Sequence, residues 1–145
     1  MIAWRISRAP FADLTGTGAR LYGGRWNSPG RAMVYAAETA ALAVLEVRVH
    51  LDLTPDLLPD DYVLAAIECG DLAVETLAAL PDDPQAFGDR WLAEARTPIL
   101  SVPSFIVPES RNLLLNPAHP DAATLAIAST RPFRFDERLW LPALS

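Results

Sequence analysis

Thirteen prolines are scattered along the 145 residues of this chain, and they restrict it to short helices and strands. Proline has no backbone N–H and disfavours helical geometry in the residue before it, so it ends most regular elements that it meets. Between the prolines, apolar runs predict strands at residues 2–7, 32–37, 62–68, 98–107 and 132–138, the fourth of them broken by Pro103. Helical spacing predicts helices at residues 39–50, with Thr39 as N-cap, at 84–96 and at 121–128. Because these elements are mixed without regular alternation, the sequence predicts an α+β fold in a single domain, residues 1–145.

Composition indicates a globular protein, since 51% of the residues are hydrophobic and 21% are charged. The apolar run AALAVLEV is too short to span a bilayer, and the N-terminus MIAWRIS has no signal-peptide core, so we expect a cytoplasmic protein with no membrane contact. A single cysteine, Cys69, excludes an internal disulfide and a cysteine-rich zinc site. His50 and His119 lie far apart in the sequence, so no metal site is predicted.

All twelve basic residues are arginine, and the absence of lysine excludes Schiff-base chemistry and a G-K-[ST] phosphate loop. The formal net charge of −6 argues against general nucleic-acid binding, which requires a positive surface. A local arginine cluster could still bind one small anion.

The stretch GGRWNSPG, residues 23–30, lies in a Gly-rich region that we expect to be a long loop, residues 10–31. Loops of that length inside a domain are usually functional. Two interpretations of Arg25 remain open here: it clamps an anion that glycine lets approach the backbone, or it caps a neighbouring element. We expect Trp26 to contribute packing.

Glu46 is the second informative residue, because it falls in an apolar helix. At about 100° per residue it shares a face with Leu42, Leu45 and Val49, and the helix is apolar nearly all round, which predicts burial. An uncompensated buried charge costs several kcal/mol, roughly, so something must offset it. Either Glu46 forms a salt bridge or pairs with His50, or it is a catalytic carboxylate that faces a pocket.

The third stretch is residues 101–120, where Ser104 follows Pro103 at a break in an apolar strand. A hydroxyl at such a break can face a cleft. Asn112 and Asn116 lie in a Pro-rich region where such residues are usually turn formers. No G-x-S-x-G elbow is present, which argues against an acyl-transfer serine.

Taken in order from Trp4 to about Leu139, these motifs resemble the RES domain family: WRI, GGRWNSPG, VYAAE, ALAVLEV, VPS and NLLLNPAHP. Residues 52–97 carry no recognised motif. The resemblance implies an ADP-ribosyltransferase-like fold, with a mixed or antiparallel sheet and flanking helices. It also implies a toxin that cleaves the nicotinamide–ribose bond of NAD, used as substrate. NAD would be depleted by hydrolysis or phosphorolysis, or its ADP-ribose would be transferred to a protein. The implied partner is an Xre-type helix-turn-helix antitoxin that blocks the active site, and a homodimer is compatible with the resemblance.

The resemblance assigns the family's named Arg, Glu and Ser to Arg25, Glu46 and Ser104, with Ser101 as a weaker candidate for the serine. It assigns NAD contacts to Arg25, Tyr35, Asn116 and Arg5. Arginine suits the diphosphate, and a carboxylate suits the positive charge that develops on the ribose. Tyr35 offers a ring face or a hydroxyl, unless it is simply a core residue. A non-catalytic module that binds a nucleotide or an antitoxin is the alternative from another functional class.

Overall fold

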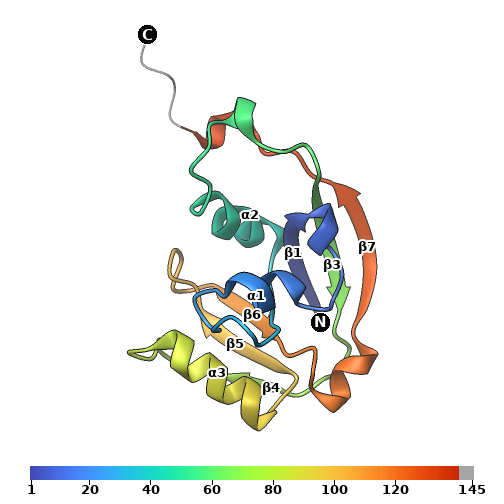
Figure 1. Ribbon diagram of the computed structural model, residues 1–145, viewed down its shortest axis with the longest axis vertical. Coiled ribbons are helices and arrows are strands. Elements are labelled where there is room, and N and C mark those ends of the chain that lie inside the picture. Colours follow the sequence, from blue (N-terminus) through green and yellow to red (C-terminus); the bar gives the residue numbers. More distant parts are fainter. Residues whose placement is uncertain (141–145) are drawn as a thin grey trace.

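The computed structural model describes residues 1–140 and arranges its strands in one seven-stranded sheet (Figure 1). The strands are β1 (Ile2–Arg8), β2 (Val34–Ala37), β3 (Tyr62–Glu68), β4 (Val74–Thr76), β5 (Ile99–Pro103), β6 (Arg111–Leu115) and β7 (Ala126–Pro132). Their order across the sheet is β4-β5-β6-β2-β1-β3-β7. Only β4 and β5 pair in parallel, so the sheet is mixed, and the expected α+β fold is confirmed.

Within residues 1–140, three α-helices accompany the sheet: α1 (Thr17–Tyr22), α2 (Ala40–Arg48) and α3 (Pro84–Glu94). Short 3-10 helices lie at Ala9–Phe11, Pro55–Leu57, Pro120–Thr124 and Glu137–Leu139. None of the helices in the described part of the chain is long and apolar enough to cross a membrane.

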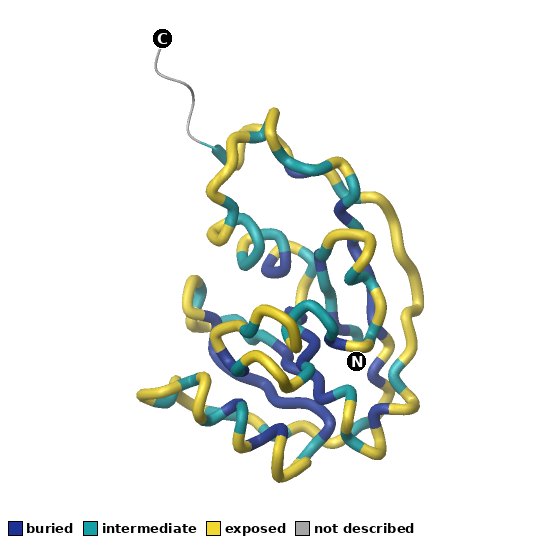
Figure 2. Tube along the Cα trace, in the orientation of Figure 1, coloured by how far each residue is buried: buried dark blue, intermediate teal, exposed yellow. Residues whose placement is uncertain are grey.

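The core lies on both faces of the central strands. One cluster joins β5 and β6 to α3 and contains Trp26, Met33, Trp91, Leu92, Leu100, Val102 and Leu114. The opposite face carries Ala3, Val34, Ala36, Ile67, Cys69, Ile99, Leu113 and Leu115. Strand β5 is buried along its whole length, whereas β7, at the edge of the sheet, is exposed along its whole length (Figure 2). Strand β7 therefore adds no buried residue to the core.

Helix α2 differs from the sequence-based expectation in one respect. Its N-cap is Thr39 as predicted, since the Thr39 side chain accepts a hydrogen bond from the Leu42 N–H. The expected burial is wrong: Leu45 is 37% exposed and Val49, just after the helix, is 53% exposed. Only Leu42 and Ala43 are buried, because a helix at the side of a sheet buries one face.

The region expected to be a loop, residues 10–31, contains α1 and part of a 3-10 helix. The helix expected at 121–128 is wrong, because the 3-10 helix Pro120–Thr124 is followed directly by β7. Strands β4 and β6 were not expected. The first is only three residues long, and the second lies in a stretch whose asparagines suggested turns.

The strand expected at 132–138 is also wrong, because β7 ends at Pro132. The alternation of apolar residues in 132–138 has another cause. Phe135 forms edge-to-face pairs with Phe133, Tyr62 and Trp140, and this aromatic cluster packs the segment near α2.

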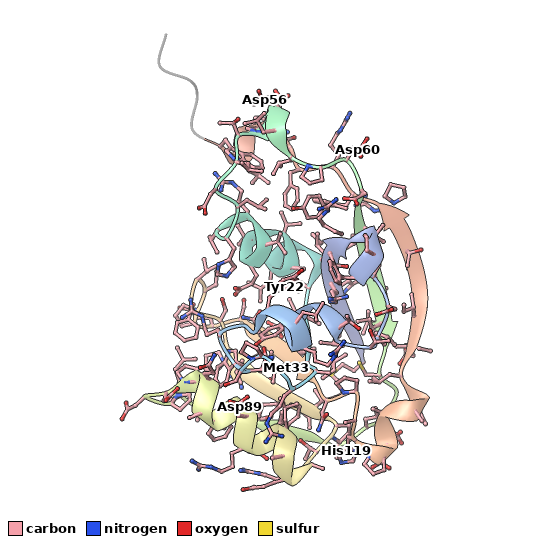
Figure 3. All side chains as sticks on the ribbon, viewed as in Figure 1. Tyr22, Met33, Asp56, Asp60, Asp89 and His119 are labelled. Atoms are coloured by element: carbon pink, nitrogen blue, oxygen red, sulfur yellow. The ribbon has the colours of Figure 1, made fainter. Side chains whose placement is uncertain are left out.

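Helix α3 packs closely on residues 23–30, called here the 23–30 loop. The Cα of Gly88 approaches the backbone of Trp26 so closely that an added Cβ would lie 1.8 Å from the Trp26 carbonyl oxygen. The nearby Asp89 carboxylate accepts hydrogen bonds from the N–H and the hydroxyl of Ser28 (Asp89 is labelled in Figure 3). Residues 52–97, which carry no motif, therefore supply the helix that braces this loop.

Replacing Gly88 with alanine should lower the free energy of unfolding by about 1–3 kcal/mol, because the new Cβ must displace α3 or the Trp26 backbone. Urea denaturation measures this loss. Gly18→Ala in α1 is the matched control: its Cβ would meet Phe11 no closer than 3.5 Å, an ordinary contact. Equal stabilities of Gly88→Ala and the parent protein would contradict the close packing.

Candidate active site

A cavity of about 810 Å³ opens on the helix-bearing side of the sheet. Its walls come from α1, the 23–30 loop, β1, β2, β6, α2 and the segment after β5, and include Tyr22, Arg25, Tyr35, Glu46, Phe105 and Asn112. Tyr22 is labelled between the ribbons of α1 and α2 in Figure 3. The cavity therefore brings together Arg25 and Glu46, which belong to different elements.

The 23–30 loop is organised by the side chain of Asn27, which is fully buried. Its amide nitrogen lies within hydrogen-bond distance of the carbonyl oxygens of Ala19, Ser28 and Arg31, at 2.9–3.1 Å. Its carbonyl oxygen accepts a hydrogen bond of 2.6 Å from the Tyr35 hydroxyl. This single side chain thus ties the loop to α1 and β2.

Tyr35 completes the arrangement, because its hydroxyl also accepts a hydrogen bond of 3.0 Å from the Trp26 N–H. A Cβ at Gly24 would lie 2.6 Å from that hydroxyl oxygen, which explains glycine at this position. Burial raises the pKa of Tyr35 to about 12. The hydroxyl is therefore committed to the loop, and the ring of Tyr35 is what the side chain can offer a ligand.

Arg25 is held differently from its neighbours in the loop. Its side chain is exposed, and its guanidinium carbon lies 3.8 Å from the centre of the Phe105 ring. Within residues 1–140 it forms no hydrogen bond to side chain or backbone and no ion pair. Stacking on an aromatic face leaves the N–H groups at the edge of the guanidinium free to bind an anion. The alternative in which Arg25 caps a neighbouring element is not what the structure contains.

Glu46 faces the cavity from α2 and is half-buried. Its Oε1 atom accepts two hydrogen bonds, 2.7 Å from the Ser104 hydroxyl and 2.8 Å from the Asn112 amide nitrogen. The Ser104 oxygen in turn accepts from the N–H groups of Ile106 and Val107, so its proton is directed at the carboxylate. Two donors thus hold Glu46 in place, and the alternative pairing with His50 is not formed.

Asn112 is the site residue that sequence reasoning missed. It lies on β6 two residues before Leu114, so both side chains fall on the helix-bearing face of the sheet. The available signal was a polar residue next to a run of leucines. An asparagine in that position is equally typical of a turn. Its Oδ1 is the only buried side-chain nitrogen or oxygen within residues 1–140 that lacks a hydrogen-bond partner. Such an atom costs about 1–3 kcal/mol.

Arg5 contributes to the cavity lining, but its guanidinium donates hydrogen bonds to the backbone carbonyls of Phe11 and Asp13. Burial lowers the pKa of Arg5, and the nearby Asp13 carboxylate partly offsets this effect. The side chain thereby connects β1 to the segment that leads into α1.

Asn116, Ser101 and Ser104 are not among the residues that line the cavity, and Ser104 is fully buried. The Asn116 side chain accepts from the Ala118 N–H and holds the turn after β6. The Ser101 hydroxyl accepts from Nε of Arg111. Of the two candidate serines, Ser104 is the one in contact with Glu46. No group of three or more histidine, cysteine, aspartate or glutamate side chains that could hold a metal occurs in the described residues.

Replacing Tyr35 with phenylalanine should lower the free energy of unfolding by about 1–3 kcal/mol near neutral pH, because Asn27 Oδ1 and the Trp26 N–H lose their partner. The raised pKa adds a pH dependence. The contribution of the protonated Tyr35 phenol to the free energy of unfolding is fully present below pH 10.0. It is lost as the pH rises through about 12.

Denaturation of the parent protein between these pH values should therefore show a loss of stability that Tyr35→Phe lacks. Tyr22→Phe, at an exposed position, is the control and should behave like the parent. Parallel curves for the parent and Tyr35→Phe would contradict a buried, hydrogen-bonded phenol.

Comparison with known proteins agrees with the motifs. The sequence model of the RES domain family matches residues 2–136 of this chain. A Sphingobium protein (strain YBL2) described as a Prs ADP-ribosylating toxin is 43% identical over 141 residues, covering 88% of this chain and 86% of its own. The "Toxin Res" of Pseudomonas putida (strain KT2440) is 38% identical, covering 97% of this chain and all of its own length.

Among solved structures, the fold is similar to one in the crystal structure of the M. tuberculosis MbcT–MbcA toxin–antitoxin complex. The TM-score is 0.75 at 23% identity, with 92% of this chain and 84% of the other covered. The family match and the identities to curated relatives lead to one conclusion: this chain belongs to the RES domain family, the family of the Res toxins.

Proposed function

We propose that this protein is a toxin that cleaves the bond between nicotinamide and ribose in NAD, with residues 1–145 acting as one NAD-binding unit. One observation carries the proposal. The same cavity is lined by a glutamate held by two hydrogen-bond donors and by an arginine that has no hydrogen bond or ion pair to any described residue. The volume of about 810 Å³ is within the range of small-molecule and cofactor sites.

Arg25 binds the diphosphate of NAD in this proposal. Its guanidinium carries a permanent charge and can donate two parallel hydrogen bonds to phosphate oxygens. Stacking on Phe105 orients the planar group before the substrate arrives, which lowers the entropic cost of binding. Arg5, a second cation in the lining, adds positive potential on the β1 side.

Glu46 stabilises the reacting ribose. Breaking the bond to nicotinamide develops positive charge on the sugar, as in glycoside hydrolysis, and a fixed carboxylate favours that charge. Nicotinamide leaves as a neutral molecule, so no strong general acid is required. Ser104 and Asn112 hold the carboxylate, and the Tyr35 ring supplies an apolar face for the nicotinamide. Asn116 has no part in this mechanism.

The fate of the ADP-ribose separates two candidate functions. In the first, water or phosphate takes the ADP-ribose and free NAD is depleted. The second is transfer to a protein, which is favoured by the 43% identical relative described as an ADP-ribosylating toxin. Purified protein with NAD, assayed for nicotinamide with and without phosphate and with the relative's named target Prs, distinguishes the two.

An Xre-type antitoxin that covers the cavity is part of the same proposal, as is a cytoplasmic location. The mouth of the cavity offers apolar contact area, because Tyr22 and Phe105 both line it and both are exposed. Apolar, partly aromatic surface of this kind is typical of protein interfaces.

Glu46→Gln should keep the fold and the affinity for NAD but lower nicotinamide release by at least about 100-fold, because it removes the charge that stabilises the transition state. Chromatographic quantification of nicotinamide measures the rate. Glu94→Gln on α3, outside the cavity lining, is the matched control and should release nicotinamide at the parental rate. A Glu46→Gln protein with parental turnover would remove Glu46 from the mechanism, and binding without turnover by the parent itself would favour a non-catalytic module.

Arg25→Ala should weaken NAD binding about tenfold or more, since a charge-assisted contact of about 1.5–3 kcal/mol is lost. Isothermal titration calorimetry measures the affinity. Arg90→Ala removes an exposed arginine of α3 and should leave the affinity unchanged. Unchanged affinity in Arg25→Ala would rule out the diphosphate clamp.

A further inference from the structure

We infer that residues 133–140, called here the 133–140 segment, hold helix α2 in place and thereby position Glu46 for the reaction, with Trp140 as the main positioning residue. This inference rests on the proposed cleavage of NAD. None of residues 133–140 lines the cavity, so the segment acts on the site from outside it. It leads from the end of β7 back to the chain that follows α2 (Figure 1).

Helix α2 is a wall of the cavity and has no solid core on that side. The residues of α2 and of the turn after it that line the cavity are Ala43, Glu46, Val47, His50 and Leu51. The outer side is not covered either, since Leu45 and Val49 are exposed. A helix between a cavity and solvent has fewer packed neighbours than a core helix, so its remaining contacts determine its position.

The 133–140 segment supplies such contacts at the C-terminal end of α2. The guanidinium carbon of Arg48 lies 4.1 Å from the centre of the Trp140 ring, and Arg48 Nε donates a hydrogen bond of 3.0 Å to the Leu139 carbonyl oxygen. The indole N–H of Trp140 donates a hydrogen bond of 2.9 Å to the carbonyl oxygen of Leu53, in the chain after the helix. Phe135, which is buried, packs edge-to-face on the same indole. Trp140 therefore connects the end of α2 to the aromatic cluster around Phe135.

The position of Glu46 depends on this end of the helix. Glu46 lies two residues before Arg48, which is about 3 Å along the helix axis. Its carboxylate must meet Ser104 and Asn112, which belong to other elements, at 2.7 and 2.8 Å. A displacement of α2 by about 1 Å would weaken these hydrogen bonds, and a misplacement of that size can lower a rate about 100-fold. Arg25 lies on a different element, so we expect the effect in turnover rather than in NAD binding.

Trp140→Ala should lower kcat for nicotinamide release about tenfold or more and change KM for NAD by less than about twofold. Trp140→Phe keeps an aromatic ring for Arg48 and Phe135 and should restore kcat to within about threefold of the parent. Arg48→Lys keeps the charge but loses the planar group that stacks on the indole, so it should lower kcat as Trp140→Ala does. Arg131→Ala is the matched control, because Arg131 lies over the Phe133 ring from β7, and it should keep the parental kcat.

A double-mutant cycle tests whether Trp140 acts through the carboxylate. If it does, Trp140→Ala changes kcat by less than about twofold when Glu46 is already glutamine. An equal loss of kcat in both backgrounds would mean that Trp140 acts elsewhere, and the inference would be wrong. A raised KM with unchanged kcat would also overturn it, because the segment would then serve binding of NAD.

Amide hydrogen exchange, followed by mass spectrometry, tests the support of α2 without reference to catalysis. Trp140→Ala should speed the exchange of the α2 amides about tenfold or more and leave the α3 amides at the parental rate. Parental exchange in α2, or an equal rise in both helices, would contradict a specific support of α2. A parent protein that releases no nicotinamide would instead refute the proposed function, and exchange in α2 would still decide whether the 133–140 segment holds that helix.

Discussion

The buried amide of Asn27 is the interaction on which the architecture of the site depends. It joins the 23–30 loop to α1 through backbone carbonyls and to β2 through the Tyr35 hydroxyl, all within a region where water is excluded. Hydrogen bonds in such surroundings are stronger than at the surface, and an unpaired group there is costly, so the loop has few alternatives. The position of Arg25, two residues before Asn27, follows from this arrangement.

Three consecutive residues of this loop therefore have different roles. Trp26 and Asn27 point inward and are consumed by packing and hydrogen bonding, while Arg25 projects outward and rests on Phe105. Helix α3 makes this possible, because Gly88 lets its backbone contact the Trp26 carbonyl. Because Trp26 and Asn27 fix the backbone of the loop, Arg25 is positioned without using the hydrogen-bond donors of its own guanidinium.

Glu46, on the α2 side of the cavity, is a negative side chain whose position is also set by the residues around it. Glu46 comes from a helix that is exposed on one side, and its carboxylate is held by donors from the segment after β5 and from β6. A half-buried carboxylate with two donors avoids the cost that full burial would impose. An arginine on one wall and a glutamate on the other give the cavity a polarity that suits a ligand with an anionic part and a hydroxyl-rich part.

Much of this could be predicted from the sequence, because the signals were local. The spacing of apolar residues and prolines indicated the α+β class, β1, β3, α2 with its Thr39 cap, and α3, since each depends on neighbours within a few residues. The motif order indicated the family. The importance of Arg25, Glu46 and Ser104 also came from that order, and their assigned chemistry stays a prediction.

Only the tertiary structure decided which side chains meet. Glu46 contacts Ser104 and Asn112 across separations of 58 and 66 residues, through a sheet register that no local pattern encodes. For the same reason α2 proved half-exposed rather than buried, and Asn116, in the same motif as Asn112, lies outside the cavity lining. Residue types and local periodicity are properties of the chain, but the faces that two distant residues share depend on how the strands between them pair.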